Sequence, residues 1–273
     1  MGGTKTVVAV CDADDGEIRA MHRIATTDGP ETMAGAVEWL AGQGGIEAVG
    51  VAAFGPVVVD PDRADYGTML ATPKPGWAGF PVLGTLRDAF PGARMALDTD
   101  VNAAALAEAG DLLDVVYITI GTGIGGGVLS GGRLVHGAGH PEFGHFKVPR
   151  MPGDDFKGVC PFHGDCLEGM ACGPAMERRW GRPASELPPG HPAWECEAHY
   201  LAHGVLALLA IVSPERVFIG GGVSQAAGFH AMVETKLRSL AAGYFPLPDD
   251  GAFVVPPVHG QEAGIRGALA LVG

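Results

Sequence analysis

The feature that most constrains the fold is an alternation of short apolar runs with helical patterns, which occurs twice along the chain. β-Branched and apolar runs bounded by turn residues predict strands at residues 6–11, 17–26, 46–53 and 94–97, and again at 115–120, 216–219 and 253–255. Apolar residues at helical spacing lie between and after them, at residues 29–43, 82–90 and 102–108 and then at 173–180, 194–213, 229–242 and 262–272. Strands followed by helices, twice over, indicate an α/β protein with two similar halves. We expect a hinge near residues 110–114.

Two glycine-rich segments directly follow predicted strands. The first is GTGIGGG at residues 121–127, and the second is GGG at residues 220–222. Glycines at such a position let backbone N–H groups approach an anion such as a phosphate. The first run is neither a Walker A motif, because no Gly-Lys-Ser/Thr follows, nor a clean dinucleotide fingerprint, because a strand pattern follows. A tight turn remains the alternative for both runs, and GGTKT at residues 2–6 is a weaker phosphate candidate of the same kind.

A cluster of potential metal ligands follows the first glycine run. Cys160, His163 and Cys166 lie at intervals of three residues in a segment interrupted by proline and glycine, and His145 lies upstream. Two thiolates and two imidazoles can enclose Zn²⁺ tetrahedrally in a closed, structural site. The spacing differs from that of a standard zinc finger, so a loop with one buried cysteine and surface histidines remains an alternative. A disulfide between Cys160 and Cys166 is disfavoured, because the rest of the chain indicates a reducing compartment.

Three carboxylates lie close to these motifs in the sequence. Asp100 follows a predicted strand and precedes a helix, where a carboxylate can accept a hydroxyl proton during phosphoryl transfer. An N-cap role explains an aspartate at that position equally simply. Glu142 and Glu168 flank the metal-ligand candidates and would accept hydrogen bonds from a polyol if zinc fixed the loop. Solvated surface carboxylates are the alternative, and no partner can be assigned to His136 or His140.

Composition narrows the class of protein. The 273 residues include 47% hydrophobic residues, enough for a core, and carry a net charge of −13. Such an acidic chain is a poor candidate for nucleic-acid binding, which needs Lys and Arg at phosphates. The N-terminal MGGTK has no apolar segment typical of a signal peptide, and the apolar run at residues 204–212 is too short to span a membrane. We therefore expect a cytoplasmic protein without a nucleic-acid or membrane partner.

Taken together, the motifs resemble those of the ROK family of sugar kinases, and most closely its bacterial fructokinases. The resemblance covers nearly the whole chain. GGTKT (2–6) and ITIGTGIGGG (118–127) resemble the phosphate motifs, FGP (54–56) the sugar-side turn, and TDVNAAALAE (99–108) the segment with the catalytic aspartate. FIGGGVS (218–224) resembles the adenosine motif, and GHPEFGH (139–145) with CPFHGDCLEG (160–169) resembles the sugar and zinc motifs. The CxxHxxC form with HPEFGH is the most specific element and points to fructokinase.

The resemblance implies an actin-like (ribonuclease H-like) fold of two α/β domains with an ATP cleft between them. It implies an N-terminal domain over residues 1–114 and a C-terminal domain over 115–273, whose last helix packs back on the first. The implied reaction is phosphorylation of fructose at its 6-hydroxyl by Mg-ATP, with Asp100 as the base and a structural Zn²⁺. Domain closure would exclude water, and a homodimer is expected.

The resemblance also assigns residues. The implied sugar-binding residues are Gly55, Pro56, Asn102, Glu142 and Glu168. The implied nucleotide-binding residues are Gly3, Thr4, Lys5, Thr122, Gly123, Gly220, Gly221 and Gly222. The implied zinc ligands are His145, Cys160, His163 and Cys166.

Two departures from the family pattern bear on activity. Members of the family normally carry a strand and an acidic residue before GGTK, whereas this chain begins at Met1. Either the true start lies upstream or the sheet lacks a strand, which would leave backbone groups unpaired. Lys74 stands in TPKPGW where relatives often have Asn, so the preferred sugar can differ. A kinase for mannose or glucose, and a sugar-binding protein without catalysis, are therefore the alternatives.

Overall fold

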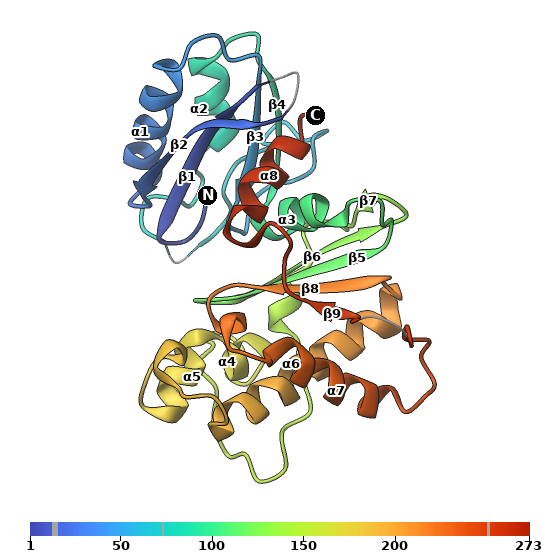
Figure 1. Cartoon of the computed structure of the whole chain (residues 1–273). Helices are drawn as coiled ribbons and strands as arrows, with labels where there is room; N and C mark the ends of the chain where they lie inside the picture. The colour runs from blue at the N-terminus through green and yellow to red at the C-terminus, as the bar shows by residue number, and fades with distance from the viewer. Residues whose placement is uncertain (13–15, 73, 250–251) are drawn as a thin grey trace. The chain divides into compact units, whose positions relative to one another are not determined.

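The structure is a computed structural model that describes residues 1–12, 16–72, 74–249 and 252–273. The chain forms two compact units (Figure 1). Unit 1 contains Met1–Ala107, Val135–His140 and Glu262–Gly273, and unit 2 contains Glu108–Leu134 and Pro141–Gln261. Each unit is made of separate segments of the chain, whereas the sequence analysis expected two continuous domains, residues 1–114 and 115–273. The last helix, α8 (Ala263–Ala270), lies in unit 1.

Unit 1 places helices on two sides of its strands (Figure 1). Its described strands form two separate pairs: β1 (Lys5–Cys11) is antiparallel to β2 (Ile18–Ala25), and β3 (Ala48–Ala53) is parallel to β4 (Arg94–Thr99). Side chains of β3 alternate between its two faces, as they must along a strand. Val49 and Val51 belong to the main core with helices α1 (Gly29–Ala41) and α2 (Val82–Ala89), whereas Ala52 packs against Ala103 and Ala268.

Helix α1 begins where the sequence predicts. The side chain of Asp28 accepts a hydrogen bond of 2.8 Å from the backbone N–H of Glu31, and Pro30 occupies the first turn. Both features satisfy or remove N–H groups that have no partner at the start of a helix. Met33 then points into the core of unit 1, in one cluster with the fully buried Trp77 and Leu83. Trp77 also donates through its Nε1 atom to the carbonyl of Thr27 at 2.7 Å.

Unit 2 is a five-stranded mixed sheet with the order β7-β6-β5-β8-β9. Strands β5 (Val115–Ile120) and β8 (Arg216–Gly220) are parallel at its centre. β6 (Ile124–Ser130) and β7 (Arg133–Leu134) extend it antiparallel on one side, and β9 (Val254–Val255) extends it in parallel on the other. Helices α4 (Leu167–Ala171), α5 (Gly173–Trp180), α6 (Pro192–Val212) and α7 (Phe229–Ala241) lie on one side of this sheet (Figure 1).

Most predicted elements are present, with shifted ends. Helix α3 (Asp100–Ala109) begins two residues before the predicted 102–108, and β6 begins inside the glycine run that the sequence suggested as one phosphate loop. The short helix α4 was not predicted. The α/β class expected from the alternating pattern is confirmed by these elements.

The apolar run at residues 204–212 lies within the longer helix α6. By length and composition alone, the 21 residues of this helix are enough to cross a membrane. Within unit 2, however, α6 packs against α7 and α4, and residues such as Tyr200, Leu201 and Val205 are fully buried. The helix therefore serves as a core element of this unit.

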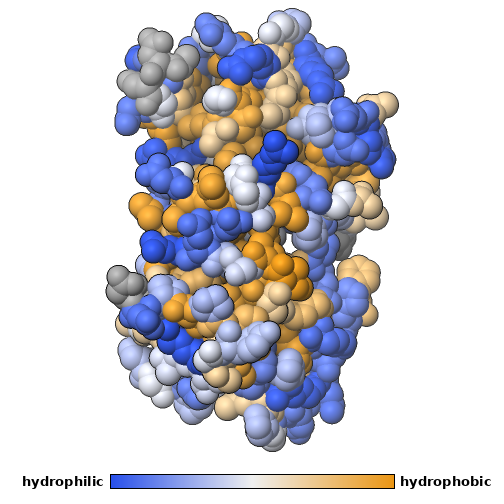
Figure 2. Space-filling view, turned by 90° about the vertical axis from the view of Figure 1, so that its right-hand side faces the viewer, coloured by the Kyte–Doolittle hydropathy of each residue, from blue (hydrophilic) through white to orange (hydrophobic). Residues whose placement is uncertain are grey.

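Hydrophilic residues are interspersed with hydrophobic ones on the face drawn in Figure 2. Large hydrophobic side chains that are exposed include Phe162, Ile211 and Tyr244, which come from three separate segments of unit 2. Single exposed apolar residues of this kind are ordinary for folded proteins.

Candidate functional site

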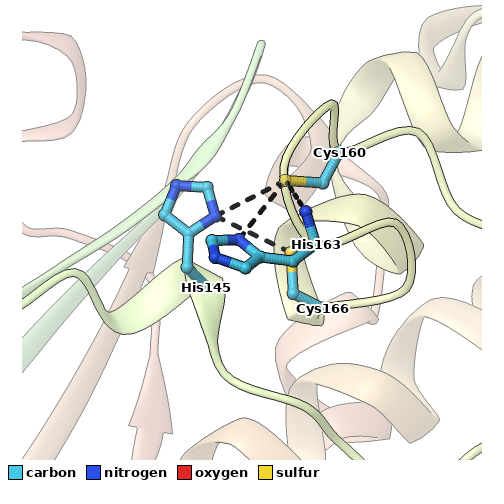
Figure 3. Close-up of side chains that lie close together, drawn as sticks. All are labelled: His145, Cys160, His163 and Cys166. Carbon is cyan, nitrogen blue, oxygen red and sulfur yellow. Dashed lines mark hydrogen bonds between the residues drawn. The ribbon is translucent and has the colours of Figure 1, made fainter. Parts of the chain in front are cut away.

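Four side chains of unit 2 converge in the arrangement that the sequence predicts for a metal (Figure 3). The ligand atoms of His145, Cys160, His163 and Cys166 all lie within 4.8 Å of one another. Sγ of Cys160 is 3.7 Å from Nδ1 of His145 and 3.7 Å from Nδ1 of His163, and Sγ of Cys166 is 3.7 Å from Nδ1 of His145. A tetrahedral zinc ion with its usual bond lengths places a sulfur and a nitrogen ligand about 3.6 Å apart. The observed spacings therefore fit Zn²⁺.

The loop that carries three of the ligands is shaped by its own backbone. Cys160 and Gly164 exchange two hydrogen bonds, at 3.2 and 2.9 Å, which closes a tight turn around His163. Backbone N–H groups point at the sulfurs, from His163 to Cys160 at 3.5 Å and from Gly169 to Cys166 at 3.4 Å. Such donors favour thiolates, the form that binds metal. Both cysteines are free and buried, whereas His145 is half-buried and His163 is exposed, so the disulfide alternative is absent and both thiols, not one, lie in the interior.

Burial acts against the thiolate until a cation is present. It raises the pKa of the Cys166 thiol to about 11, and the neighbouring Cys160 and Glu168 add to this shift. A divalent cation bound by these thiols would reverse the balance, because metal ligands are deprotonated and the ion would neutralise their charge.

Glu168 connects the ligand cluster to the first glycine run. Its Oε2 accepts a hydrogen bond of 3.0 Å from the backbone N–H of Ile124, and its Oε1 lies 3.9 Å from Nε2 of His145. Gly123 permits this approach, since a Cβ atom there would lie 2.5 Å from Oε2 of Glu168. Gly144 is required in the same way, because its Cβ would lie 2.1 Å from the carbonyl oxygen of Ile124. The glycines thus bring the two motifs into contact.

Glu142 precedes the short helix η1 (Phe143–His145) that carries the first metal-ligand candidate. Desolvation by the surrounding chain raises the pKa of its carboxyl, with Glu168 adding to the shift and His145 partly opposing it. Repulsion between two neighbouring carboxylates is relieved when a ligand donates hydrogen bonds to them. Glu142 and Glu168 therefore form a pair of acceptors suited to hydroxyl groups.

The glycine turns of unit 2 lie at one edge of its sheet. Strands β5 and β8 are parallel and paired, with Thr119 opposite Gly220, so their carboxyl ends meet at the same edge. Gly121–Gly123 form the turn after β5, closed by a 2.9 Å bond from the Gly121 N–H to the Gly123 carbonyl. Ligands of open α/β sheets bind at this kind of edge. The candidate nucleotide residues Thr122, Gly123 and Gly220–Gly222 are thus brought together.

Asp100 is the first residue of α3 in unit 1, directly after β4. Its Oδ1 accepts a 3.0 Å bond from the next N–H, that of Val101. The hydroxyl of Thr99, not Asp100, accepts the N–H of Asn102 at 3.2 Å, which is the geometry of an N-cap. The capping role that the sequence offered as an alternative for Asp100 is therefore filled by its neighbour.

Unit 1 also contains two turns that the sequence analysis assigned to ligand binding, one to the nucleotide and one to the sugar. Gly3 and Thr4 form a turn before β1, and Lys5 begins that strand. Gly55 and Pro56 follow β3, where the Pro56 carbonyl accepts the N–H of Leu70 at 2.9 Å. These residues are placed at strand ends, as the sequence predicts.

A set of contacts around Asp98 was not identified from the sequence. Asp98 is 4% exposed, and His136 and Asn102 donate to its carboxylate. His140 lies 3.5 Å from the Thr99 hydroxyl, and burial lowers its pKa to about 4, so its ring is neutral near pH 7. The contacts of His136 with Asp98 and of His140 with Thr99 join residues far apart in the sequence, so no local pattern predicts them.

Comparison with known proteins gives the class to which this fold and these motifs belong. The model of the ROK family matches residues 1–273. A fructokinase from Zymomonas mobilis is 40% identical over 283 residues, covering 99% of this chain and 93% of that protein. A ROK hexokinase from Thermus thermophilus has a structure with a TM-score of 0.77 and 28% identity, covering 100% of this chain and 96% of that one.

A further structure, a ROK family glucokinase from Streptomyces griseus solved in complex with glucose and AMPPNP, has a TM-score of 0.74 and 26% identity. It covers 100% of this chain and 98% of that one. This chain belongs to the ROK family. The resemblance stated from the motifs is confirmed, and so is the actin-like (ribonuclease H-like) two-domain α/β fold that it implied.

Proposed function

We propose that this protein is an ATP-dependent fructokinase, which phosphorylates fructose at its 6-hydroxyl. The observation that carries the proposal is the family membership together with Asp100, a carboxylate at the carboxyl end of β4 whose capping role Thr99 has taken over. Relatives named fructokinase, from Zymomonas mobilis and Pediococcus pentosaceus, are 40% and 37% identical over 99% of this chain, which supports fructose as the sugar.

Asp100 is the proposed general base. Phosphoryl transfer requires little covalent chemistry from the protein, so positioning and charge neutralisation carry most of the rate. A carboxylate at this strand end accepts the proton of the sugar hydroxyl as the bond to phosphorus forms. Mg²⁺ would accompany ATP and neutralise charge on its phosphates.

The sugar-binding residues are proposed to be Glu142 and Glu168, with the turn of Gly55 and Pro56. Carboxylate oxygens are strong acceptors for hydroxyl groups, and the raised pKa of Glu142 reflects surroundings in which such donors would stabilise the charge. Asn102 belongs to the same proposal through its Oδ1 atom, which is buried and has no hydrogen-bond partner among the described residues.

Nucleotide binding is assigned to the glycine turns. In unit 1 the proposed residues are Gly3, Thr4 and Lys5, and in unit 2 they are Thr122, Gly123, Gly220, Gly221 and Gly222. Backbone N–H groups of such turns bind phosphate without requiring a basic protein. This agrees with the net charge of −13.

Zn²⁺ is the proposed occupant of the cluster formed by His145, Cys160, His163 and Cys166. Its contribution would be structural, because four protein ligands leave no open position for a substrate. Nδ1 of His145 is directed at the cluster, and Nε2 of the same ring faces the carboxylate of Glu168. A carboxylate is a common partner for the second nitrogen of a zinc-bound imidazole. A homodimer in the cytoplasm completes the proposal.

A coupled assay of ADP release tests the function. Zinc-replete protein is supplied with Mg-ATP and with fructose, glucose or mannose in parallel. Fructose turnover that Asp100→Asn removes, and that the exposed-site control Asp88→Asn retains, supports both the reaction and the base. A higher kcat/KM for glucose or mannose would instead favour another hexose, and the side chain of Lys74 is the first one to exchange for Asn.

A further inference from the structure

The corner that carries the proposed base is held by a segment from another part of the sequence. After β7 ends at Leu134 in unit 2, residues Val135–His140 belong to unit 1, and Pro141 returns to unit 2. We call Val135–His140 the strap. Two of its side chains contact the corner between β4 and α3, His136 at Asp98 and His140 at Thr99. Asp100 is the next residue of that corner.

Asp98 accepts three hydrogen bonds. Its Oδ1 receives the backbone N–H of Thr99 at 2.7 Å and the amide of Asn102 at 2.9 Å, and its Oδ2 lies 2.8 Å from Nε2 of His136. A buried carboxylate is tolerated only when such donors replace water. Each of the three bonds joins a different part of the corner: the strand end, the first turn of α3 and the strap.

The chemistry of the partners fixes the proton on His136. An ionised carboxylate only accepts, so the Nε2 atom that faces Asp98 must carry a hydrogen. The amide nitrogen of Asn102 is 3.2 Å from the same Nε2 and is also a donor, so it cannot be the partner of that hydrogen. Asp98 therefore selects the Nε2–H form of His136 and points it at Oδ2.

We propose that Asp98 and His136 are positioning residues for the base, a role that rests on the proposed kinase function. Their bond anchors the strap to the β4–α3 corner and holds the backbone from which Asp100 projects. Neither Asp98 nor His136 needs to touch the sugar for this role.

Positioning has a kinetic signature that a purely stabilising contact lacks. A base displaced by a fraction of an ångström binds substrate as before but transfers the proton less well. We expect His136→Ala to lower kcat roughly 10- to 100-fold, while KM for fructose and for ATP changes less than about twofold. His136→Gln should recover most of kcat, because the glutamine amide nitrogen can donate from a position similar to that of Nε2.

The experiment compares His136→Ala, His136→Gln and Asp98→Asn with His22→Ala, whose ring stacks on Trp39 in the exposed strand β2. Fold is verified by circular dichroism, and kcat and KM are measured with fructose. Loss of kcat in His136→Ala and Asp98→Asn, recovery in His136→Gln and no change in His22→Ala support the role. A folded His136→Ala protein with the kcat of the wild type, or a glutamine variant no better than alanine, overturns it.

A measurement that needs no turnover separates this inference from the proposed function. In ¹⁵N NMR spectra of histidine-labelled wild-type protein, His136 should show the Nε2–H form, and Asp98→Asn should change its signals. The Nδ1–H form in the wild type, or no response to Asp98→Asn, refutes the pairing. Absence of turnover with every hexose in a protein that shows the predicted NMR signals would refute the kinase function and the positioning role while leaving the pairing established.

Discussion

Replacing Glu108 by Gln should destabilise unit 2 strongly. Glu108 is 5% exposed, and its two oxygens accept the backbone N–H groups of Val258 at 2.6 Å and His259 at 3.0 Å. A hydrogen bond to a charged group contributes about 1.5–3 kcal/mol. Glutamine keeps the shape but offers one acceptor, and its amide nitrogen would face the second N–H. We therefore expect a loss of roughly 2–4 kcal/mol, which corresponds to a lower Tm by roughly 4–16 °C in a chain of this size.

The chain offers a matched control at Glu215. One oxygen of that side chain accepts the N–H groups of Leu113 at 2.9 Å and Asp114 at 3.0 Å, but the residue is exposed. Water can replace the lost acceptor there, so Glu215→Gln should cost less than about 1 kcal/mol.

Thermal unfolding and amide hydrogen exchange of the peptide around Val258 and His259 measure the two effects. Glu108→Gln should lower Tm and accelerate exchange at these two amides. Equal losses of stability for Glu108→Gln and Glu215→Gln would refute the reasoning, because burial would then not decide the cost.

Three further predictions concern the base, the metal and a buried acid. Asp100→Asn should lower kcat by roughly 10²- to 10⁴-fold with little change in Tm, measured by ADP release and thermal unfolding. Cys166→Ser should lose bound zinc in elemental analysis, whereas Cys11→Ser, outside the cluster, should retain it. Burial raises the pKa of Glu197 well above its ordinary value, with Arg179 partly opposing. The stability that this carboxyl contributes is present below its unfolded pKa and is lost as pH rises toward the folded value. Glu197→Gln should therefore gain stability relative to the wild type between pH 5 and pH 8, and a constant difference in Tm over that range would contradict the assignment.

Local patterns were sufficient to predict most elements and the metal-ligand cluster. The helix α1 follows from Asp28 and Pro30 at its start, and the four potential metal ligands predicted from the cysteine and histidine spacing lie close together. The start of β6 was missed because the glycines at 125–127 read as a loop. Their pairing with residues 117–119 of β5 makes them a strand, and such pairing is a tertiary effect that local propensity does not contain.

Contacts between distant residues limited the prediction of the candidate site. His136 and His140 carry no local pattern, and their partners Asp98 and Thr99 lie roughly 40 residues earlier in the chain. The short helix α4 has five residues, too few to show a helical period, and its start is set by the thiol of Cys166, which accepts the N–H of Gly169. The capping role of Thr99 was hidden for the same reason, since the adjacent Asp100 is an equally suitable cap by residue type.

The position of the metal-ligand cluster explains why a structural ion would matter for sugar binding. His145 ends the short helix η1, which Glu142 precedes, and Cys166 caps α4, whose first turn contains Glu168. An ion held by both segments would fix the distance between the two carboxylates, which would otherwise repel each other. Loss of the ion would therefore disturb the two carboxylates that accept sugar hydroxyls. The glycine turns after β5 and β8 would keep their positions, because the pairing of these two strands holds them. Loss of zinc should therefore raise KM for fructose more than KM for ATP, and an equal change in both would show that the cluster supports the whole of unit 2 and not these two carboxylates.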